Sequence, residues 1–396
     1  MTGAEHFVLY LSYDGLTDPL GQSQILPYLG GLSRYNITIL SFEKKNRFEA
    51  GKIAVQEFCR RHHLNWVPLV YHRSPPVFST LYDLWMLKRK ARDLHRKYYF
   101  RIIHCRSYIT ALVGLWMKRK YDVKFIFDMR GFWADERVEG GLWNLKNPVY
   151  RSIYSFFKKK EKRFIGEADA IISLTENARQ EILRWNLNPS IHVIPCCVDL
   201  DRFDPARTTT LQQEALRKEL GVKPDEFVLL YLGSLGTWYL VNEMLDFFTQ
   251  VKKLRQNARF LFVTPDTFDV RYSPYPEDII FRSVSQGKVP LMISLAHASV
   301  VFIKPVFSKK ASSATKMAEV LAMGIPVVTN IGWGDIALFQ NTLPGLLTVS
   351  KPEDYPKAIS MLLQTKHPGD IRNGAATHFS LAQGVALYNA VYQDLM

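Results

Sequence analysis

Short apolar runs alternate with longer amphipathic stretches along the first half of the chain, and the same alternation restarts in the second half. Apolar runs of this length are typical of buried strands, and the stretches between them are long enough for helices. The runs lie at residues 7–11, 37–42, 66–71, 102–105, 125–127, 170–174 and 192–195, and then at 227–232, 260–264, 279–284, 300–303 and 327–329. This alternation predicts right-handed βαβ units and parallel sheets, and therefore an α/β protein with two doubly wound, Rossmann-like domains.

The polar stretch 199–224 separates the two halves and contains little that is suited to a core. We therefore predict an N-terminal domain at 1–200, a linker region at 201–224 and a second domain at 225–378. Residues 379–396 are predicted to end the chain as a packed helix, because apolar residues recur there at mostly helical spacing.

Composition fits a globular chain of this size, since 47% of the 396 residues are hydrophobic and 22% are charged. The charge, however, is unevenly placed. Residues 1–200 hold 31 Lys and Arg residues against 19 Asp and Glu residues, a net +12 of the total +14. The N-terminal half is therefore the part that we expect to meet an anionic partner.

The four cysteines, Cys59, Cys105, Cys196 and Cys197, show no metal-binding spacing, and adjacent cysteines rarely form a disulfide. No apolar run approaches the length of about eighteen residues that a membrane-spanning helix needs. Residues 1–6 also lack the basic region of a signal peptide. We expect a cytoplasmic protein.

The segment 316–330 is predicted to form a short helix that ends at Gly324 and continues through Pro326 into a buried strand. Lys316 and Glu319 lie one turn apart at its start. At the carboxyl edge of a parallel sheet, a helix N-terminus supplies amide donors for an anion, and nearby side chains select the rest of the ligand. The segment therefore predicts a site for a phosphate and a sugar.

Four segments in this order, 13–24, 193–199, 231–236 and 316–329, resemble the GT-B glycosyltransferases, and most of all the retaining family 4 enzymes of bacterial polysaccharide and cell-envelope assembly. The resemblance covers nearly the whole chain. It implies two Rossmann-like domains facing a central cleft, with a C-terminal helix packing back toward the first domain. It also implies transfer of a sugar from a nucleotide-sugar to a glycan or lipid-linked acceptor, with retention, without a divalent metal and without another cofactor.

Two features depart from the family pattern. The family usually has a Glu eight residues before the position of Glu319, where this chain has Ala311, and a usual Arg and Lys pair after the Gly233 loop is missing. The missing Glu normally receives hydroxyls of the donor sugar. Because Lys309 and Lys310 stand beside Ala311, we hypothesise an acidic donor sugar, which equal turnover of neutral and uronic-type donors would contradict.

Lys316 is the first catalytic candidate, because the departing nucleotide phosphate needs fixed positive charge. Glu319 is a candidate clamp for the ribose hydroxyls. The alternative for both is a solvated residue on a helix surface. Further candidates for the donor are the hydroxyls of Ser313 and Thr315, which are otherwise plain helix caps. The remaining predicted donor contacts are Gly233, Ser234, Gly236 and Thr264, at strand ends of the second domain.

In the first half, Gly15 and Gly21 flank a turn-rich loop in which the backbone is expected to approach a phosphate or sugar, and Gln22 follows it. A purely structural turn is the alternative. Arg106 and Arg130 follow two predicted strands, and we expect them to act in catalysis by holding a donor or acceptor phosphate. Asp128 and Glu136 belong to the same loop region. The alternative is a buried ion network with Asp128, Asp135 or Glu136.

No pair of residues has the pattern of a nucleophile and its base. The resemblance therefore implies a front-face reaction, in which the departing phosphate helps to deprotonate the acceptor. The segments 85–101 and 150–164 combine many Lys and Arg residues with aromatic ones. Such helices suit an anionic membrane surface, where the protein would be peripheral, or they simply present a solvated cationic face.

Two other function classes remain open from the sequence. A GT-B sugar-nucleotide epimerase would use Lys316 and Glu319 without an acceptor. A basic nucleic-acid-binding or membrane-surface protein without enzymatic activity would leave the 316–329 segment unexplained, and retention on heparin that ignores nucleotide-sugars would favour it. We expect no nucleic-acid partner.

Overall fold

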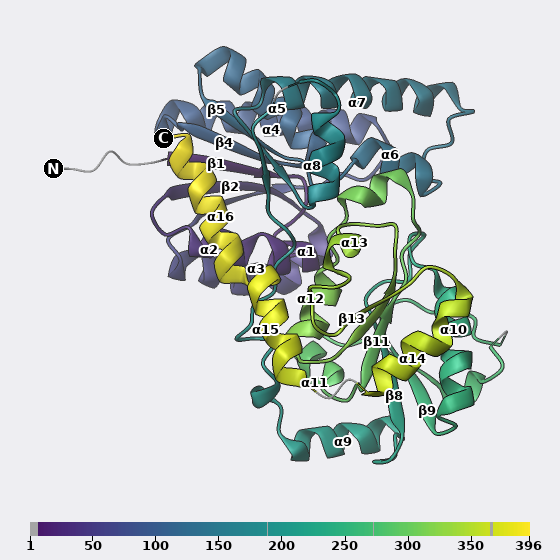
Figure 1. Cartoon of the computed structure of the whole chain (residues 1–396). Coiled ribbons are helices and arrows are strands. Elements are labelled where there is room, and N and C mark those ends of the chain that lie inside the picture. The colour runs from purple at the N-terminus through teal and green to yellow at the C-terminus, as the bar shows by residue number, and fades with distance from the viewer. Residues whose placement is uncertain (1–6, 188, 272, 365–366) are drawn as a thin grey trace. The chain divides into compact units, whose positions relative to one another are not determined.

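The computed structural model describes residues 7–187, 189–271, 273–364 and 367–396, and the chain divides into two compact units (Figure 1). The first unit consists of the chain up to Pro195 together with Leu381–Met396. The second unit is Cys196–Ser380. Residues 1–6, on which the expectation about a signal peptide rested, lie outside the described residues.

The first unit is built on a seven-stranded parallel sheet with the order β3-β2-β1-β4-β5-β6-β7. The central strands are buried along nearly their whole length, because helices cover both faces of a sheet in this class of fold. From β1 the chain adds strands first on one side of the sheet and then, from β4, on the other side. In open α/β sheets, ligands bind at such a switch point, here between β1 and β4. The strands are β1 (Phe7–Ser12), β2 (Asn36–Glu43), β3 (Asn65–Val70), β4 (Ile102–Arg106), β5 (Lys124–Asp128), β6 (Ala170–Ser173) and β7 (Ile191–Val193).

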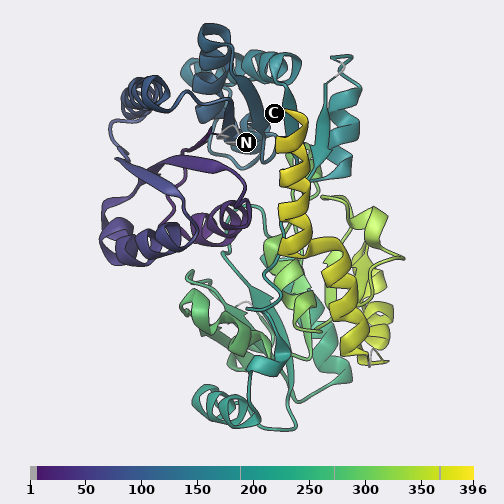
Figure 2. The same ribbon diagram turned by 90° about the vertical axis from the view of Figure 1, so that its left-hand side faces the viewer.

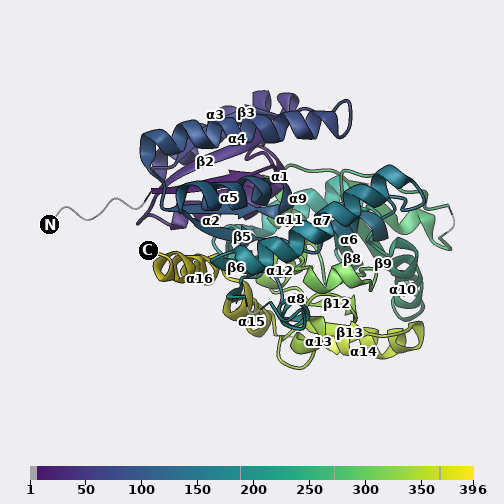
Figure 3. The same ribbon diagram turned by 90° about the horizontal axis from the view of Figure 1, so that it is seen from above.

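Nine α-helices of the described chain belong to this unit. They are α1 (Pro19–Gln24), α2 (Leu26–Gly31), α3 (Lys45–Arg61), α4 (Phe78–Tyr98), α5 (Ser107–Tyr121), α6 (Trp133–Glu139), α7 (Pro148–Glu167), α8 (Glu176–Leu183) and α16 (Leu381–Asp394). The long helices α4 and α7 are seen from above in Figure 3. The C-terminal helix α16, yellow in Figure 2, packs on α2, so the expectation that it packs back toward the first domain is confirmed.

The second unit has a six-stranded parallel sheet with the order β10-β9-β8-β11-β12-β13, and its chain reverses between β8 and β11. Its strands are β8 (Phe227–Leu232), β9 (Ala258–Val263), β10 (Ile279–Arg282), β11 (Ala298–Val301), β12 (Val327–Asn330) and β13 (Leu346–Val349). The apolar pattern therefore predicted every strand of both sheets except β13. The expected α/β class with two Rossmann-like sheets is confirmed.

Helices surround the second sheet as well. They are α9 (Thr210–Leu220), α10 (Val241–Leu254), α11 (Val289–Ile293), α12 (Thr315–Ala322), α13 (Ile336–Phe339), α14 (Tyr355–Gln364) and α15 (Pro368–Phe379), with short 3₁₀ turns that include Phe307–Ala311. Apolar residues of α12 and α15 belong to one core cluster of this unit, and those of α10 and α14 belong to another.

The predicted linker, 201–224, differs from the structure, because it is folded and belongs to the second unit. Helix α9 begins there with a capping box in which Thr209 and Gln212 satisfy each other's amides. Leu216 and Leu220 are buried in the core of this unit. The polar composition concealed a helix with one narrow apolar face, which periodicity over so few residues does not reveal.

No helix within the described ranges is both long enough and apolar enough to cross a membrane.

Candidate active site

In the second unit, the start of α12 meets the loop that follows β8. Gly233 has a φ of +110°, and a Cβ built on it would lie 2.6 Å from Nζ of Lys316. That ammonium donates to the hydroxyl of Tyr231 (3.3 Å) and lies 3.6 Å from the ring centroid of Tyr239. Two aromatic rings and a glycine thus fix the cation, because any side chain at position 233 would displace it.

Helix α12 presents its first-turn amides without a hydroxyl cap. Ala314 occupies the N-cap position and its methyl group has nothing to accept their hydrogen bonds, while Thr315 is the first helical residue. The hydroxyl of Ser313, predicted to meet a phosphate, instead accepts the amide of Cys196 at 3.0 Å. Amides at such a helix start are a general anion-binding feature.

Glu319 lies one turn beyond Lys316, as the helical spacing predicted, and both side chains are half-buried. Burial raises the pKa of Glu319 to about 7, against the opposing charges of Arg202 and Lys316. Burial likewise lowers the pKa of Lys316 to about 7, and Glu319 opposes this. Each group therefore titrates near pH 7, which is typical of a site where a ligand completes the charge balance.

Arg202 is a site residue that the sequence did not reveal, because it lies in the stretch predicted as a linker. Its guanidinium donates to the carbonyl of Gln286, and its charge acts on Glu319. Only the folding of residues 196–224 onto the second unit brings it to α12.

The loop after β8 is tied to the end of β9 by a second missed residue, Asp266. Its carboxylate accepts the amide of Leu235 at 2.7 Å, and its own amide donates to the hydroxyl of Thr264 at 3.1 Å. Thr264 is buried, whereas Ser234 and Gly236 are exposed. Thr264 therefore holds the loop, and the predicted donor contacts Gly233, Ser234 and Gly236 remain accessible on it.

Ala311, at the place of the family's usual Glu, is buried and offers no polar group. Lys309 is buried as well, and its Nζ lies 3.9 Å from the ring centroid of Trp238. The positive charge beside Ala311 is therefore held over an aromatic ring that belongs to the β8 loop. The hypothesis of an acidic donor sugar stays a prediction.

Asp199 and Asp201 form an Asp-x-Asp sequence, a spacing that invites comparison with a metal site. Oδ1 of Asp199 accepts the amides of Asp201 (3.0 Å) and Arg202 (3.1 Å), which is the geometry of an Asx turn. Within the described part of the chain, no group of three or more His, Cys, Asp or Glu side chains is arranged to hold a metal ion. Metal independence stays a prediction.

In the first unit, a buried carboxylate gathers the predicted arginines. Asp128, at the end of β5, has Oδ2 at 3.9 Å from Nη1 of Arg106 and Oδ1 at 3.8 Å from Nη1 of Arg130. Its Oδ2 also accepts the hydroxyl of Tyr388 at 3.1 Å and lies 3.5 Å from Nε2 of His104. Burial opposes ionisation, but Arg130, His104 and Arg106 outweigh it, so the pKa of Asp128 lies below its ordinary value.

This strand-end cluster of Asp128, Arg106, Arg130 and His104 is the ion network that the sequence left open as an alternative. Some of its polar atoms nevertheless lack a hydrogen bond within the described chain. Among the described residues, Nε and Nη1 of Arg106 and Oδ1 of Asp128 are buried without a hydrogen bond. Two neighbouring residues that are not glycine have left-handed backbones, Ser107 (φ 69°) and Arg130 (φ 57°). Strained backbone and unsatisfied charge at strand ends are features of ligand sites.

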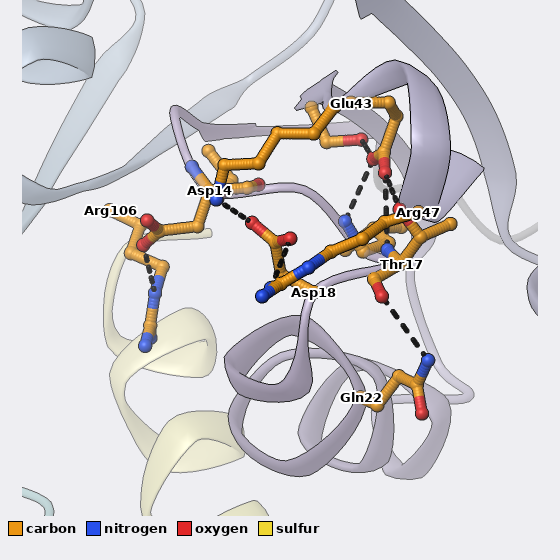
Figure 4. A network of polar contacts seen from close by, with 11 residues as sticks. Asp14, Thr17, Asp18, Gln22, Glu43, Arg47 and Arg106 are labelled. Carbon is orange, nitrogen blue, oxygen red and sulfur yellow. Dashed lines mark hydrogen bonds and ion pairs between the residues drawn. The ribbon is translucent and has the colours of Figure 1, made fainter. Parts of the chain in front are cut away.

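The loop after β1 is organised by Glu43 of β2 (Figure 4). This buried carboxylate accepts the amides of Leu16 (2.8 Å) and Thr17 (3.1 Å) and the hydroxyls of Thr17 and Ser41. A Cβ on Gly15 would lie 2.7 Å from Oε2 of Glu43. Gly15 therefore makes room for a side chain of the protein, which is the structural turn that the sequence left open.

Gly21 has the same kind of role, because a Cβ there would lie 2.2 Å from the carbonyl oxygen of Gly15. Gln22 is exposed, and its amide donates to the carbonyl of Thr17 at 3.4 Å. Asp18 accepts from Lys44 and Arg47 at 2.7 Å each, and Figure 4 shows Arg47 reaching Asp18. These bonds fix the loop. At the same edge of the sheet, Oδ2 of Asp14 lies 3.7 Å from Nε of Arg106.

Glu136 lies on α6 and is half-buried. Its neighbour Asp135 accepts the hydroxyl of Tyr154 (2.8 Å) and the ammonium of Lys158 (2.7 Å), both from α7. The acidic residues of the 128–141 segment therefore divide between the strand-end cluster and an attachment of α6 to α7.

Several cations of the basic segment 85–101 lie over aromatic rings. Nζ of Lys88 lies 4.3 Å and Nζ of Lys120 lies 5.6 Å from the ring centroid of Trp116 on α5. Helix α4 also exposes an apolar stripe at the spacing i, i+3, i+4, i+7, and Phe78 is 71% and Trp85 53% exposed. The α4 stripe consists of Phe78, Leu81, Tyr82 and Trp85.

Comparison with known proteins adds to this geometry. The model of Glycosyltransferase Family 4 matches residues 31–202. The D-inositol 3-phosphate glycosyltransferase of Geodermatophilus obscurus is 27% identical over 382 residues, covering 88% of this chain and 80% of that protein. The alpha-monoglucosyldiacylglycerol synthase of Streptococcus pneumoniae is 21% identical over 247 residues, covering 61% of this chain and 54% of that protein.

The structure of Anabaena Alr3699/HepE in complex with UDP-glucose superposes with a TM-score of 0.67 at 12% identity, covering 98% of this chain and all of that one. The two-sheet architecture is therefore the GT-B fold. Together with the sequence matches, it defines this chain as a glycosyltransferase of the GT-B class.

Proposed function

We propose that this protein binds a nucleotide-sugar at the Lys316 site of its second unit and transfers the sugar to an acceptor that its first unit holds. The observation behind the proposal is the cation of Lys316, fixed against Gly233 and two tyrosines at the start of α12. A fixed ammonium beside uncapped helix amides suits a phosphate. The UDP-glucose complex of the Anabaena protein supports a nucleotide-sugar of this kind.

The residues divide the work of transfer. Lys316 and the first-turn amides of α12 stabilise the negative charge that develops on the departing phosphate, and Glu319 accepts hydrogen bonds from the ribose hydroxyls. Gly233, Ser234 and Gly236 offer backbone groups to the same ligand. The reaction proceeds with retention and without a divalent cation, as the family resemblance implies.

The acceptor meets the strand-end cluster of the first unit. Arg106 and Arg130 hold an anionic group of the acceptor, because Nε and Nη1 of Arg106 are buried and make no hydrogen bond among the described residues. The acceptor is a lipid-linked or growing cell-surface glycan. The name of the Streptococcus pneumoniae relative, a glucosyldiacylglycerol synthase, supports a lipid among the acceptors.

The α4 stripe supports a peripheral position on the inner face of the plasma membrane. Four exposed apolar side chains on one helix, followed by Lys88, Arg89, Lys90 and Arg92, combine apolar insertion with attraction to anionic lipid. The unit that carries them also holds most of the net positive charge.

The first test measures the melting temperature of the purified protein against UDP, GDP, ADP, CMP and their sugars. A ligand that binds the native state raises this temperature by mass action. We expect one nucleotide family to raise it, and we expect Lys316→Ala and Glu319→Ala to lose the shift. The exposed Lys253→Ala on α10 is the matched control and keeps the shift. The absence of any shift in the wild-type protein would contradict the proposal.

Turnover then separates the alternatives. Mass spectrometry of the donor and of added acceptor lipids detects a glycosylated lipid if the proposal holds, with undiminished yield in EDTA. An epimerised donor sugar without any acceptor product would identify an epimerase instead. Binding to heparin that nucleotide-sugars leave unchanged, with no turnover, would favour the nucleic-acid-binding alternative.

Membrane association has its own test. We expect the protein to co-sediment with phosphatidylglycerol vesicles and only weakly with phosphatidylcholine vesicles. Phe78→Ser combined with Trp85→Ser should reduce co-sedimentation about tenfold or more, because each removes an inserted side chain worth roughly 1.5–3 kcal/mol. Ile53→Ser, at a 79% exposed position on α3, is the control. Equal loss in the control would show that the α4 stripe has no special role.

A further inference from the structure

A histidine and a buried aspartate form a dyad at the carboxyl edge of the first sheet. His72 follows β3, and its Nδ1 lies 2.6 Å from Oδ1 of Asp83 on α4. Asp83 is fully buried, whereas the His72 side chain is 38% exposed. Oδ2 of Asp83 also accepts the backbone amide of His72 (3.2 Å) and the hydroxyl of Tyr13 (2.9 Å).

These contacts set the tautomer of the imidazole. An ionised carboxylate accepts hydrogen bonds only, so Nδ1 of His72 carries the proton that faces Asp83. In the neutral imidazole Nε2 then has the lone pair, and none of the described residues bonds to it. The His72 and Tyr82 rings pack nearly perpendicular to each other, with the centroids 5.1 Å apart, so the imidazole has a second contact that fixes it.

The dyad lies at the same edge of the sheet as the strand-end cluster. The parallel registers pair Ser12 with Arg106, and Glu43 with Val70, so β1, β2, β3 and β4 end together. Tyr13, which binds Asp83, is followed by Asp14, whose carboxylate is 3.7 Å from Nε of Arg106. A ligand at Arg106 therefore has the β1 loop and His72 as neighbours within one unit.

We propose that Nε2 of His72 binds a hydroxyl group of the acceptor, and that Asp83 is the positioning residue that orients it. This inference rests on the proposed function and names a residue for its acceptor site. The acceptor class it implies is a hydroxylated headgroup, one hydroxyl of which donates to Nε2. Nothing in the packing of α4 requires Nε2, because Nδ1 and the backbone amide already make the bonds to Asp83.

The matched variants exploit the two ring nitrogens separately. His72→Asn keeps a donor near the position of Nδ1 and removes Nε2, whereas His72→Gln extends a polar group toward the position of Nε2. The probes are D-inositol 3-phosphate and diacylglycerol in phosphatidylglycerol vesicles, taken from the names of the two relatives, with the nucleotide-sugar that stabilises the wild-type protein.

We expect His72→Asn to raise the KM for the accepted probe about tenfold, the effect of one hydrogen bond, with an unchanged melting temperature and an unchanged nucleotide shift. His72→Gln should recover part of the loss. A wild-type KM in His72→Asn would overturn the inference and leave the dyad as an attachment of α4. Failure of the wild-type protein to glycosylate either probe would instead count against the proposed function, and the inference would fall with it.

Discussion

At the scale of single residues, the second unit holds a cation and a carboxylate that are both close to losing their charge. Lys316 and Glu319 each have a pKa of about 7, because burial penalises both ions more than they stabilise each other. A bound phosphate would restore the charge of the lysine. The affinity of this site should therefore depend on pH within the physiological range.

We expect nucleotide affinity to be highest near pH 7. Above that pH, Lys316 must take up a proton before it can bind phosphate, so affinity falls by up to about tenfold per pH unit. Below it, Glu319 is protonated and accepts fewer hydroxyl bonds. Titration calorimetry at pH 8 in two buffers of different ionisation enthalpy should show proton uptake. Glu319→Gln should remove the acidic limb and move the alkaline limb to lower pH, because the charge of Glu319 raises the pKa of Lys316. A flat profile in the wild-type protein would contradict this account.

The same lysine should cost the ligand-free protein stability. Its folded pKa lies below the ordinary value of 10.5, so the penalty is full below pH 7 and shrinks as the pH rises toward 10.5. Lys316→Met keeps an unbranched side chain against Tyr239 and removes the charge. We expect its melting temperature to exceed that of the wild-type protein at pH 6, by less at pH 9, with the nucleotide shift abolished. A lower melting temperature at both values would refute this.

At the scale of elements, the loop after β1 shows how a glycine serves packing rather than a ligand. Glu43 satisfies amides and hydroxyls of this loop, and Gly15 and Gly21 leave the space that the arrangement needs. The loop thereby reaches the strand-end cluster through Asp14 with a fixed backbone.

Gly21→Ala should destabilise the first unit, because its Cβ would lie 2.2 Å from a backbone oxygen that cannot rotate away. Overpacking of this kind costs about 1–3 kcal/mol. Gly166→Ala on α7 is the control, since nothing lies within 4 Å of its Cβ and alanine favours a helix. Urea denaturation followed by circular dichroism measures both. Equal stability of the two variants would mean that the β1 loop accommodates the added methyl group at little cost in free energy.

At the scale of the whole molecule, the chain returns to its first unit after completing the second. Helix α16 brings Tyr388 to Asp128 and Tyr392 to His104 (2.8 Å), inside the first unit. The strand-end cluster thus depends on the last residues of the chain as well as on β4 and β5.

Tyr388→Phe should therefore weaken the first unit without touching the donor site. It removes a hydrogen bond to a buried, charged carboxylate, a loss of about 1.5–3 kcal/mol. Calorimetry should show a lower melting temperature, while the shift produced by the nucleotide stays as in the wild-type protein. Tyr98→Phe on α4 is the control for a lost tyrosine hydroxyl. An unchanged melting temperature in Tyr388→Phe would mean that another group satisfies Asp128.

The sequence by itself determined the architecture and the placement of Lys316 and Glu319 on one helix. Apolar runs separated by helical lengths report burial on both faces of a parallel sheet, and this local periodicity predicted twelve of the thirteen strands. Lys316 and Glu319 were found for the same reason, because residues three apart on one helix share a face. The GT-B resemblance then ordered these segments.

Only the tertiary structure decided which distant residues meet. Tyr388 lies 260 residues from Asp128, Arg202 comes to Glu319 from a stretch that resembled a linker, and His72 finds Asp83 across a turn into α4. It also decided that Gly15 and Gly21 pack against the protein and that Ser313 binds Cys196. Hydrogen bonds of this kind depend on distances of a few tenths of an ångström between separate elements, and such distances leave no periodic trace in the sequence.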